Sequence, residues 1–226
     1  MEQTPHITVK GEAEVRVIPD QVILALGVET RNNNLTRAKA ENDQIVQKAL
    51  SVAQDHGLEA EHIQTDYLSM NPEYDRFPNT SKFLGYLVRK SIVLTLKNLT
   101  KLETLLTEIL NAGVNTIHDV QFRTTELKKH RDEARMLAIK AAEEKAKALA
   151  GALNMTVGQP LAIDEEGLGW SAWNRRWWGR YHNMPSQISV PGERSSSLEA
   201  TETVAPGEIS INAKITVTFE ITPLPK

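Results

Sequence analysis

Apolar and polar positions alternate most regularly near the end of the chain, over residues 207–222. Strict alternation is typical of a long β-strand with one buried face. The same alternation runs through residues 7–17 near the start of the chain. Because the two ends share this pattern, we expect them to pair, which places Val15 and Ile215 in one sheet. If the last strand completes the sheet that the first strand begins, it can bury its apolar face only when the chain between them is folded. We therefore predict one cooperative domain over residues 6–223.

Between the two ends, the apolar period switches between that of strands and that of helices. Residues 22–29 are almost continuously apolar, which predicts a central strand covered on both faces. The asparagines at 32–34 and the glycine at Gly57 mark the two ends of a first helix. Thr100 and Glu103 have the spacing of a capping box at the start of a second helix. The expected elements are strands at 22–29, 63–70, 83–97, 114–123 and 157–163, and helices at 35–56, 100–112 and 125–154.

The region from Asp20 to Arg123 therefore has the order strand, helix, strand, strand, helix, strand. This is the split βαβ order of ferredoxin-like folds, in which two helices cover one face of an antiparallel sheet. A loop through Pro72 and Pro78 is expected to end the strand that begins at Ile63. We predict an α+β fold with a mostly antiparallel sheet, a ferredoxin-like βαββαβ section, a long third helix, and paired N- and C-terminal strands.

The expected third helix, over residues 125–154, is rich in alanine. Its small residues would let the helix lie close to the sheet that it covers. Lysines and glutamates occupy the opposite face. The predicted core stripe of this helix consists of Ile139, Ala142, Ala146, Leu149 and Leu153, with Ala138, Ala141, Ala148 and Ala152 beside it.

A segment of about forty residues, 164–206, shows no periodicity, and we interpret it as a long loop insertion. It contains all four tryptophans of the chain, interleaved with arginines. Trp and Arg are enriched where protein surfaces meet, so an oligomer or partner interface is the leading interpretation. Contact with a membrane surface is second, and stacking on sugar or single-stranded nucleic acid is third. The candidate interaction residues are Trp170, Trp173, Arg175, Arg176, Trp177, Trp178, Arg180 and Tyr181.

A structural explanation of this segment has the same weight as the interface. Four tryptophans can form a satellite core that covers an open face of the protein's own sheet. In that case the tryptophans serve folding and not recognition.

The composition argues against most kinds of chemistry. A formal net charge of −3 gives no general attraction for nucleic acid, so we expect no nucleic-acid partner. The chain has no cysteine, hence no thiolate nucleophile and no Cys-ligated zinc. Nucleophile-elbow, Walker and dinucleotide-binding motifs are missing from the sequence. We therefore expect no enzyme activity, no cofactor and no metal.

The remaining candidates for chemistry are weak. The six histidines are scattered without metal-binding spacing, and those at His56 and His62 are expected to be solvated or to cap a helix end. Asp164, Glu165 and Glu166 could bind a cation or do acid–base work, but a short acidic run in a loop is more often solvent-exposed.

Several long segments of the chain resemble the SIMPL-domain family, which includes bacterial periplasmic immunogenic and oxidative-stress-defence proteins. They follow the family order over nearly the whole chain. The resembling segments are ITVKGEAEVRVIPDQVILALGVET, IQTDYLSMNPEYD, GYLVRKSIVLTLKNLTKLETLL, NAGVNTIHDVQF, ARMLAIKAAEEKAKALAGALNMTVGQPLAIDE and APGEISINAKITVTFEI.

The resemblance implies an α+β fold, an envelope location and, in some relatives, ring-like or channel-like homo-oligomers. It implies no catalytic residues. We therefore expect a non-enzymatic, self-assembling periplasmic protein linked to oxidative or envelope stress defence. The alternative is a soluble adaptor or binding module that recognises a protein partner through the Trp/Arg loop. The resemblance supports a binding role because a mammalian member of the family acts as an adaptor for a kinase. The first residues run directly into a strand, which predicts a periplasmic protein whose signal was removed, or otherwise a cytoplasmic one.

Overall fold

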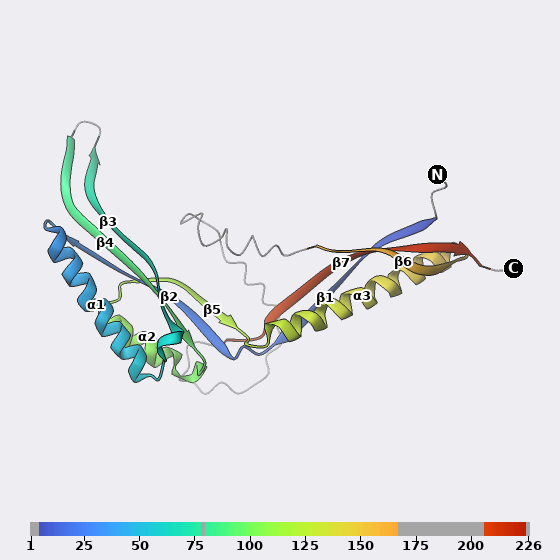
Figure 1. Ribbon diagram of the computed structural model, residues 1–226, viewed down its shortest axis with the longest axis horizontal. Helices are drawn as coiled ribbons and strands as arrows, with labels where there is room; N and C mark the ends of the chain where they lie inside the picture. The colour runs from blue at the N-terminus through green and yellow to red at the C-terminus, as the bar shows by residue number, and fades with distance from the viewer. Residues whose placement is uncertain (1–4, 78–79, 167–205, 225–226) are drawn as a thin grey trace. The chain divides into compact units, whose positions relative to one another are not determined.

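The computed structural model describes residues 5–77, 80–166 and 206–224, except for the side chains of residues 76–81 (Figure 1). The chain forms two compact units. Among the described residues, unit 1 combines the N-terminal residues up to Val17, residues 126–166, and the C-terminal strand from Ser210. Unit 2 is built mainly from Ile18–Thr125. Each unit has its own sheet and its own hydrophobic core.

Unit 2 has the predicted split βαβ order. Its sheet has the strand order β3-β4-β2-β5, and every neighbouring pair is antiparallel. The ferredoxin-like prediction is therefore confirmed. The elements are β2 (Gln21–Asn32), α1 (Leu35–Asp55), a 3₁₀ turn (Ala60–His62), β3 (Ile63–Phe77), β4 (Thr80–Leu96), a second 3₁₀ turn (Leu99–Lys101), α2 (Leu102–Asn111) and β5 (Thr116–Arg123).

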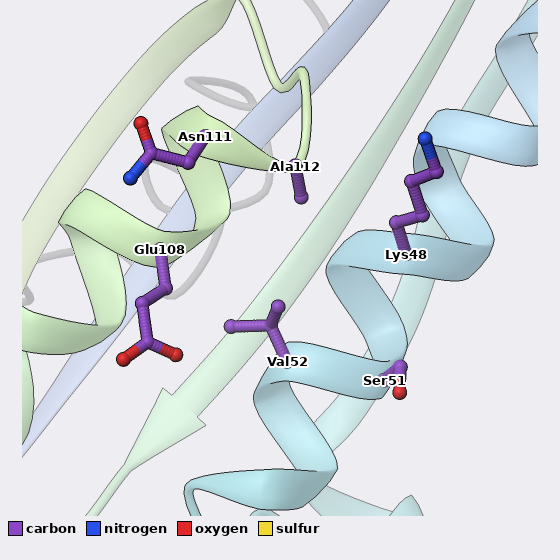
Figure 2. A pocket seen from close by; sticks show the side chains of 6 residues that line it. All are labelled: Lys48, Ser51, Val52, Glu108, Asn111 and Ala112. Atoms are coloured by element: carbon purple, nitrogen blue, oxygen red, sulfur yellow. The ribbon is translucent and has the colours of Figure 1, made fainter.

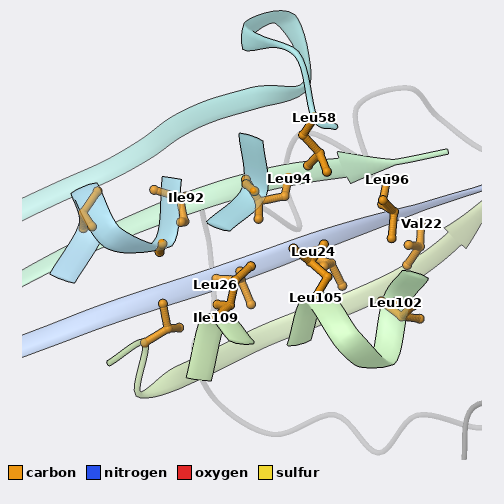
Figure 3. Close-up of a cluster of buried hydrophobic side chains, with 14 of the residues drawn as sticks. Val22, Leu24, Leu26, Leu58, Ile92, Leu94, Leu96, Leu102, Leu105 and Ile109 are labelled. Carbon is orange, nitrogen blue, oxygen red and sulfur yellow. The ribbon is translucent and has the colours of Figure 1, made fainter. Parts of the chain in front are cut away.

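The core of unit 2 lies between the sheet and the two helices α1 and α2. Figure 3 shows side chains of β2 and β4 meeting those of the helices, with Leu24, Ile92 and Leu105 fully buried. Full burial of each such side chain stabilises the fold by about 1.5–3 kcal/mol. On the other face of β2, Ile23 and Ala25 are only half-buried. The strand is central as predicted, but the expected burial of both faces is wrong, because both helices of unit 2 pack on one face.

Two local predictions in unit 2 need correction. β3 continues through Pro72, which is paired with Tyr86, so this proline does not end the strand. Proline is tolerated there because β3 is an edge strand, where a missing N–H costs no ladder bond.

The capping box expected at Thr100 and Glu103 does not form at the start of the second helix. Asn98 instead accepts a hydrogen bond from the Thr100 N–H at 3.1 Å, ahead of a 3₁₀ turn.

Unit 1 joins the two ends of the chain. Its elements are β1 (His6–Val17), α3 (Leu127–Ala152), β6 (Met155–Glu165) and β7 (Ile209–Pro223), and its sheet has the order β1-β7-β6. Thr8 and Thr218 share a hydrogen bond of 2.9 Å between their hydroxyl groups. The prediction that Val15 and Ile215 lie in one sheet is confirmed. β7 is the central strand of this sheet, with β1 on one side and β6 on the other, and is therefore not an edge strand.

The buried face of α3 differs from the predicted stripe. Only Ala142 and Ala146 of that stripe are buried, and Ile139, Leu149 and Leu153 are exposed. The helix touches the sheet through a row of alanines spaced by four: Ala134, Ala138, Ala142, Ala146 and Ala150. A Cβ added at Gly11 of β1 would lie 1.9 Å from the backbone oxygen of Ala138. The approach is so close that the larger side chains of α3 cannot fit beneath the helix.

Candidate interaction surfaces

The candidate interaction residues between Trp170 and Tyr181 lie outside the described residues. The neighbouring acidic residues are described. Glu165 accepts a hydrogen bond from Arg135 Nε at 2.8 Å, and Glu166 forms an ion pair with Lys10. These carboxylates therefore tie β6 to α3 and to β1, and this structural role fits the solvent-exposed interpretation.

The described histidines have structural partners. His56 Nε2 lies 3.1 Å from a carboxylate oxygen of Glu108, and only 12% of the His56 side chain is exposed. His56 is therefore not solvated, but it is the C-cap residue of α1, so the helix-end alternative of that expectation is confirmed. His118 Nε2 lies 3.3 Å from Ser91 Oγ, over the backbone of Gly27.

A row of apolar side chains lies uncovered on the face of the unit 2 sheet that carries the helices. Leu68, Tyr74 and Phe83 are 51%, 49% and 39% exposed. We call this row the apolar strip. It consists of Leu68, Met70, Pro72 and Tyr74 on β3, and Phe83 and Tyr86 on β4.

The pairing register places the strip on the helix side of the sheet. Leu68 is opposite Lys90, whose Nζ donates to Asp43 of α1 at 2.5 Å. Tyr86 is opposite Asn32, whose side chain donates to Glu41 of α1 at 3.0 Å. Directly opposite residues share one face of a sheet. The strip therefore continues the apolar face of the sheet beyond the area that α1 covers.

The outer half of the strip stands on a two-stranded ribbon. The pairing of β4 with β2 ends at Tyr86, while β3 and β4 stay paired to Phe77 and Thr80. Figure 1 shows this hairpin extending beyond the N-terminal end of α1. The rings of Tyr74 and Phe83 meet edge to face with centroids 5.6 Å apart, and those of Phe83 and Tyr86 with centroids 5.2 Å apart. Such a ribbon is marginally stable alone, and the ring contacts help to hold it.

Unit 1 exposes apolar side chains of its own. Met136 and Leu137 on α3 are exposed, as are Leu161 and Ile163 on β6. Ile163 is opposite the buried Val217, so it lies on the same face of the sheet as α3. Exposed apolar groups that gather on one element indicate a contact surface more strongly than single scattered ones do.

The opposite face of the unit 1 sheet is polar and charge-balanced. Lys214 Nζ lies 2.7 Å from Glu12 and 3.9 Å from Glu166. The hydrogen bond from Lys214 lowers the pKa of Glu12, and that from Lys10 lowers the pKa of Glu166. The hydrogen bond to Glu12 in turn raises the pKa of Lys214. These charges are matched within the subunit, which is typical of a solvated face and not of a docking site.

A groove of about 430 Å³ runs between α1 and α2 (Figure 2). Lys48, Ser51 and Val52 line it from α1, and Glu108 and Asn111 from α2. Its ammonium and carboxylate groups have opposite charge, so the groove has no electrostatic preference for an anion or a cation.

One group of described residues has the geometry of a metal site. Ligand atoms of Glu59, Glu61 and His62 lie within 4.8 Å of one another. Both carboxylates are exposed, and His62 Nδ1 lies 3.3 Å from Glu61. Exposed carboxylates are hydrated, and a histidine already paired with one of them does not mark a built site.

Comparisons with known proteins identify relatives over the whole described fold. The model of the family SIMPL, described as "Protein of unknown function (DUF541)", matches residues 7–219. The "Uncharacterized protein YggE" of Edwardsiella ictaluri is 31% identical over 160 residues, which is 70% of this chain and 67% of the relative. The "26 kDa periplasmic immunogenic protein" of Brucella melitensis is 27% identical over 228 residues, covering 97% and 86%.

A human protein is similar over a comparable length. The "Interleukin-1 receptor-associated kinase 1-binding protein 1" is 24% identical over 223 residues, which is 96% of this chain and 77% of the relative. Among the described residues, no helix is long and apolar enough to cross a membrane.

Proposed function

Because the chain belongs to the SIMPL family, we propose that it is a non-enzymatic, self-assembling periplasmic protein linked to oxidative or envelope stress defence. The observation that carries the self-assembly is the apolar surface left open on each of the two units. Both the apolar strip of unit 2 and the exposed side chains of α3 and β6 in unit 1 are available to neighbours. A subunit with two separate contact surfaces can join more than one neighbour and so build a closed assembly.

The periplasmic location is supported by the Brucella relative, whose name includes the compartment and which covers nearly the whole chain. Fractionation of cells that express the full natural gene tests it. We expect the protein in the osmotic-shock fluid with a periplasmic marker. Recovery with the cytoplasmic marker would contradict the location.

The absence of enzyme activity is supported by the sequence, which has no cysteine and none of the common nucleophile or phosphate-binding motifs. A stress-protective role would then depend on binding or assembly and not on thiol chemistry. Generic ester, phosphate and peroxide substrates should show no turnover. Activity that disappears when one histidine or carboxylate is replaced would overturn this part of the proposal.

The second candidate is a binding module for a protein partner, and the human relative favours it because its name states that it binds a kinase. The contact would be made by the Trp/Arg segment, for which membrane-surface contact is also open. The two candidates differ in one property. A self-assembling protein forms particles alone, whereas an adaptor stays monomeric until its partner is present.

A further inference from the structure

We propose that the outer end of the β3–β4 hairpin is an arm that swings about a hinge at Gly85, an inference that does not depend on the proposed self-assembly. The arm consists of residues 74–77 of β3 and 80–83 of β4. It carries the outer part of the apolar strip, which includes Tyr74 and Phe83. Motion at the hinge changes the angle between the outer and inner parts of the strip.

The arm begins where the sheet of unit 2 loses its third strand. The pairing of β4 with β2 ends at the pair Tyr86 and Asn32. Beyond this pair, within the part of the chain that the structure describes, the strands of the arm pair only with each other. A two-stranded hairpin is marginally stable alone, whereas the sheet inside Tyr86 is supported by α1 and α2. The edge of the rigid sheet therefore lies next to Gly85.

The backbone of β4 is irregular at the same place. Glu73 is opposite Gly85, but Tyr74 is opposite Phe83, so Leu84 is an extra residue on β4. A β-bulge of this kind interrupts the ladder and bends the strand. Figure 1 shows β3 and β4 turning where they pass the N-terminal end of α1.

Gly85 has the backbone freedom that a hinge requires. Its φ is 128°, a value that residues with a side chain rarely adopt. A Cβ at this position would lie 3.1 Å from the backbone oxygen of Asn32. Hinges are a few residues that absorb a change of φ and ψ, and glycine does so over the widest range. The bulge and the glycine together place the hinge at residues 84 and 85.

One contact ties the arm to the sheet on each face. On the helix side, the ring of Phe83 meets that of Tyr86 edge to face, with centroids 5.2 Å apart. On the other face, Glu73 forms an ion pair of 2.5 Å with Arg31 of β2. A single ring contact and an exposed ion pair are both weak interactions. Either tie can therefore break and re-form while the strands of the arm stay paired.

Distances between paired spin labels measure the swing in the full chain, which has no native cysteine to react with the label. Gln47→Cys, at an exposed position of α1, is the reference, and Lys82→Cys is the position on the arm. The matched control pairs Gln47→Cys with Gln64→Cys, where β3 belongs to the four-stranded sheet. Dilution with unlabelled wild type restricts the measurement to distances within one chain.

We expect the distance distribution of the arm pair to be at least about twofold broader than that of the control pair, because only the arm lies beyond the hinge. Equal widths would overturn the hinge.

A second position on the arm distinguishes a hinge from separation of the strands. Asp75 is opposite Lys82 in the pairing register. If the two strands swing as one unit, Asp75→Cys gives the same broad distribution as Lys82→Cys. A broad distribution at only one of the two positions would mean that the strands separate, which overturns the hinge.

The two ties predict the direction of the swing. Phe83→Ala releases the helix-side contact, so the arm should move away from α1 and the mean distance to Gln47→Cys should lengthen. Glu73→Gln releases the contact on the other face, so the same distance should shorten. Shifts in one common direction, or no shift in either variant, would contradict a hinge that is held between these two contacts.

Discussion

Asn42 Nδ2 in α1 donates a hydrogen bond to the backbone carbonyl of Val28 in β2 at 2.8 Å. The same nitrogen lies 3.3 Å from the carbonyl of Val88 in β4, and Asn42 is fully buried. One amide group thus links α1 to two strands in the middle of the apolar core. Removing it leaves two buried carbonyls without this donor.

We expect Asn42→Ala to lower the free energy of unfolding by about 1–3 kcal/mol, the cost of leaving buried polar groups unsatisfied. Urea denaturation of the two proteins measures the change. Gln44→Ala, at an exposed position of the same helix, is the control and should change stability by less than about 0.5 kcal/mol. An equal effect of both variants would contradict the role of Asn42.

The close approach of α3 to β1 gives a second prediction. Gly11→Ala places a methyl group against the backbone of Ala138 and Ala142, so we expect a loss of about 1–3 kcal/mol or more from overpacking. Gly151→Ala is the matched control, because an added Cβ there meets nothing within 4 Å. In a helix this control should stabilise by up to about 1 kcal/mol. A tolerated Gly11→Ala would mean that α3 lies farther from the sheet.

The carboxylates on the polar face of unit 1 predict an acid sensitivity. The pKa values of Glu12 and Glu166 are lowered in the folded state, so each contributes stability above the ordinary glutamate pKa of about 4.3 and loses it as the pH falls below that value. The raised pKa of Lys214 acts in the other direction, and its contribution is lost as the pH rises past the ordinary lysine value of about 10.4.

Thermal melts between neutral and acid pH test this dependence. Glu166→Gln should melt lower than the wild type at neutral pH and approach it in acid. Glu144→Gln, on the exposed side of α3, is the control and should follow the wild type at every pH. Parallel curves for Glu166→Gln and the wild type would show that its ion pairs contribute nothing to stability, as many surface pairs do.

The sequence predicts the elements of this fold better than it predicts their faces. The alternation at both chain ends and the helix signals around Gly57 and Gly113 depend on local chemistry, and the left-handed φ of 88° and 109° at these two glycines confirms the helix ends. The buried side of α3 depends instead on how closely its backbone meets Gly11. That distance depends on the tertiary structure, which the periodicity of the helix does not show. The prediction therefore placed the larger Ile139 and Leu149 in the core, whereas both are exposed.

The apolar strip could be found only in part from the sequence. Leu68, Met70, Pro72 and Tyr74 alternate with polar residues, as in any half-buried strand. The pattern alone predicts that this face is covered, and only the position of α1 shows that it is not. The Trp/Arg segment has the stronger compositional signal, but its residues lie outside the described ones and its role stays a prediction.

That role can be tested by replacement. If Trp173, Trp177 and Trp178 form an assembly interface, changing all three to serine should reduce the particle mass while the circular dichroism of the subunit stays the same. Light scattering and circular dichroism on the same samples measure both. A triple variant with full mass would leave the satellite-core or membrane interpretation.

Self-assembly is tested most directly by the mass of the native particle in solution. One chain has a mass of 25.2 kDa. Light scattering coupled to size exclusion is expected to give a defined multiple of this mass that persists on dilution into the micromolar range. A particle of 25.2 kDa at high protein concentration would contradict self-assembly.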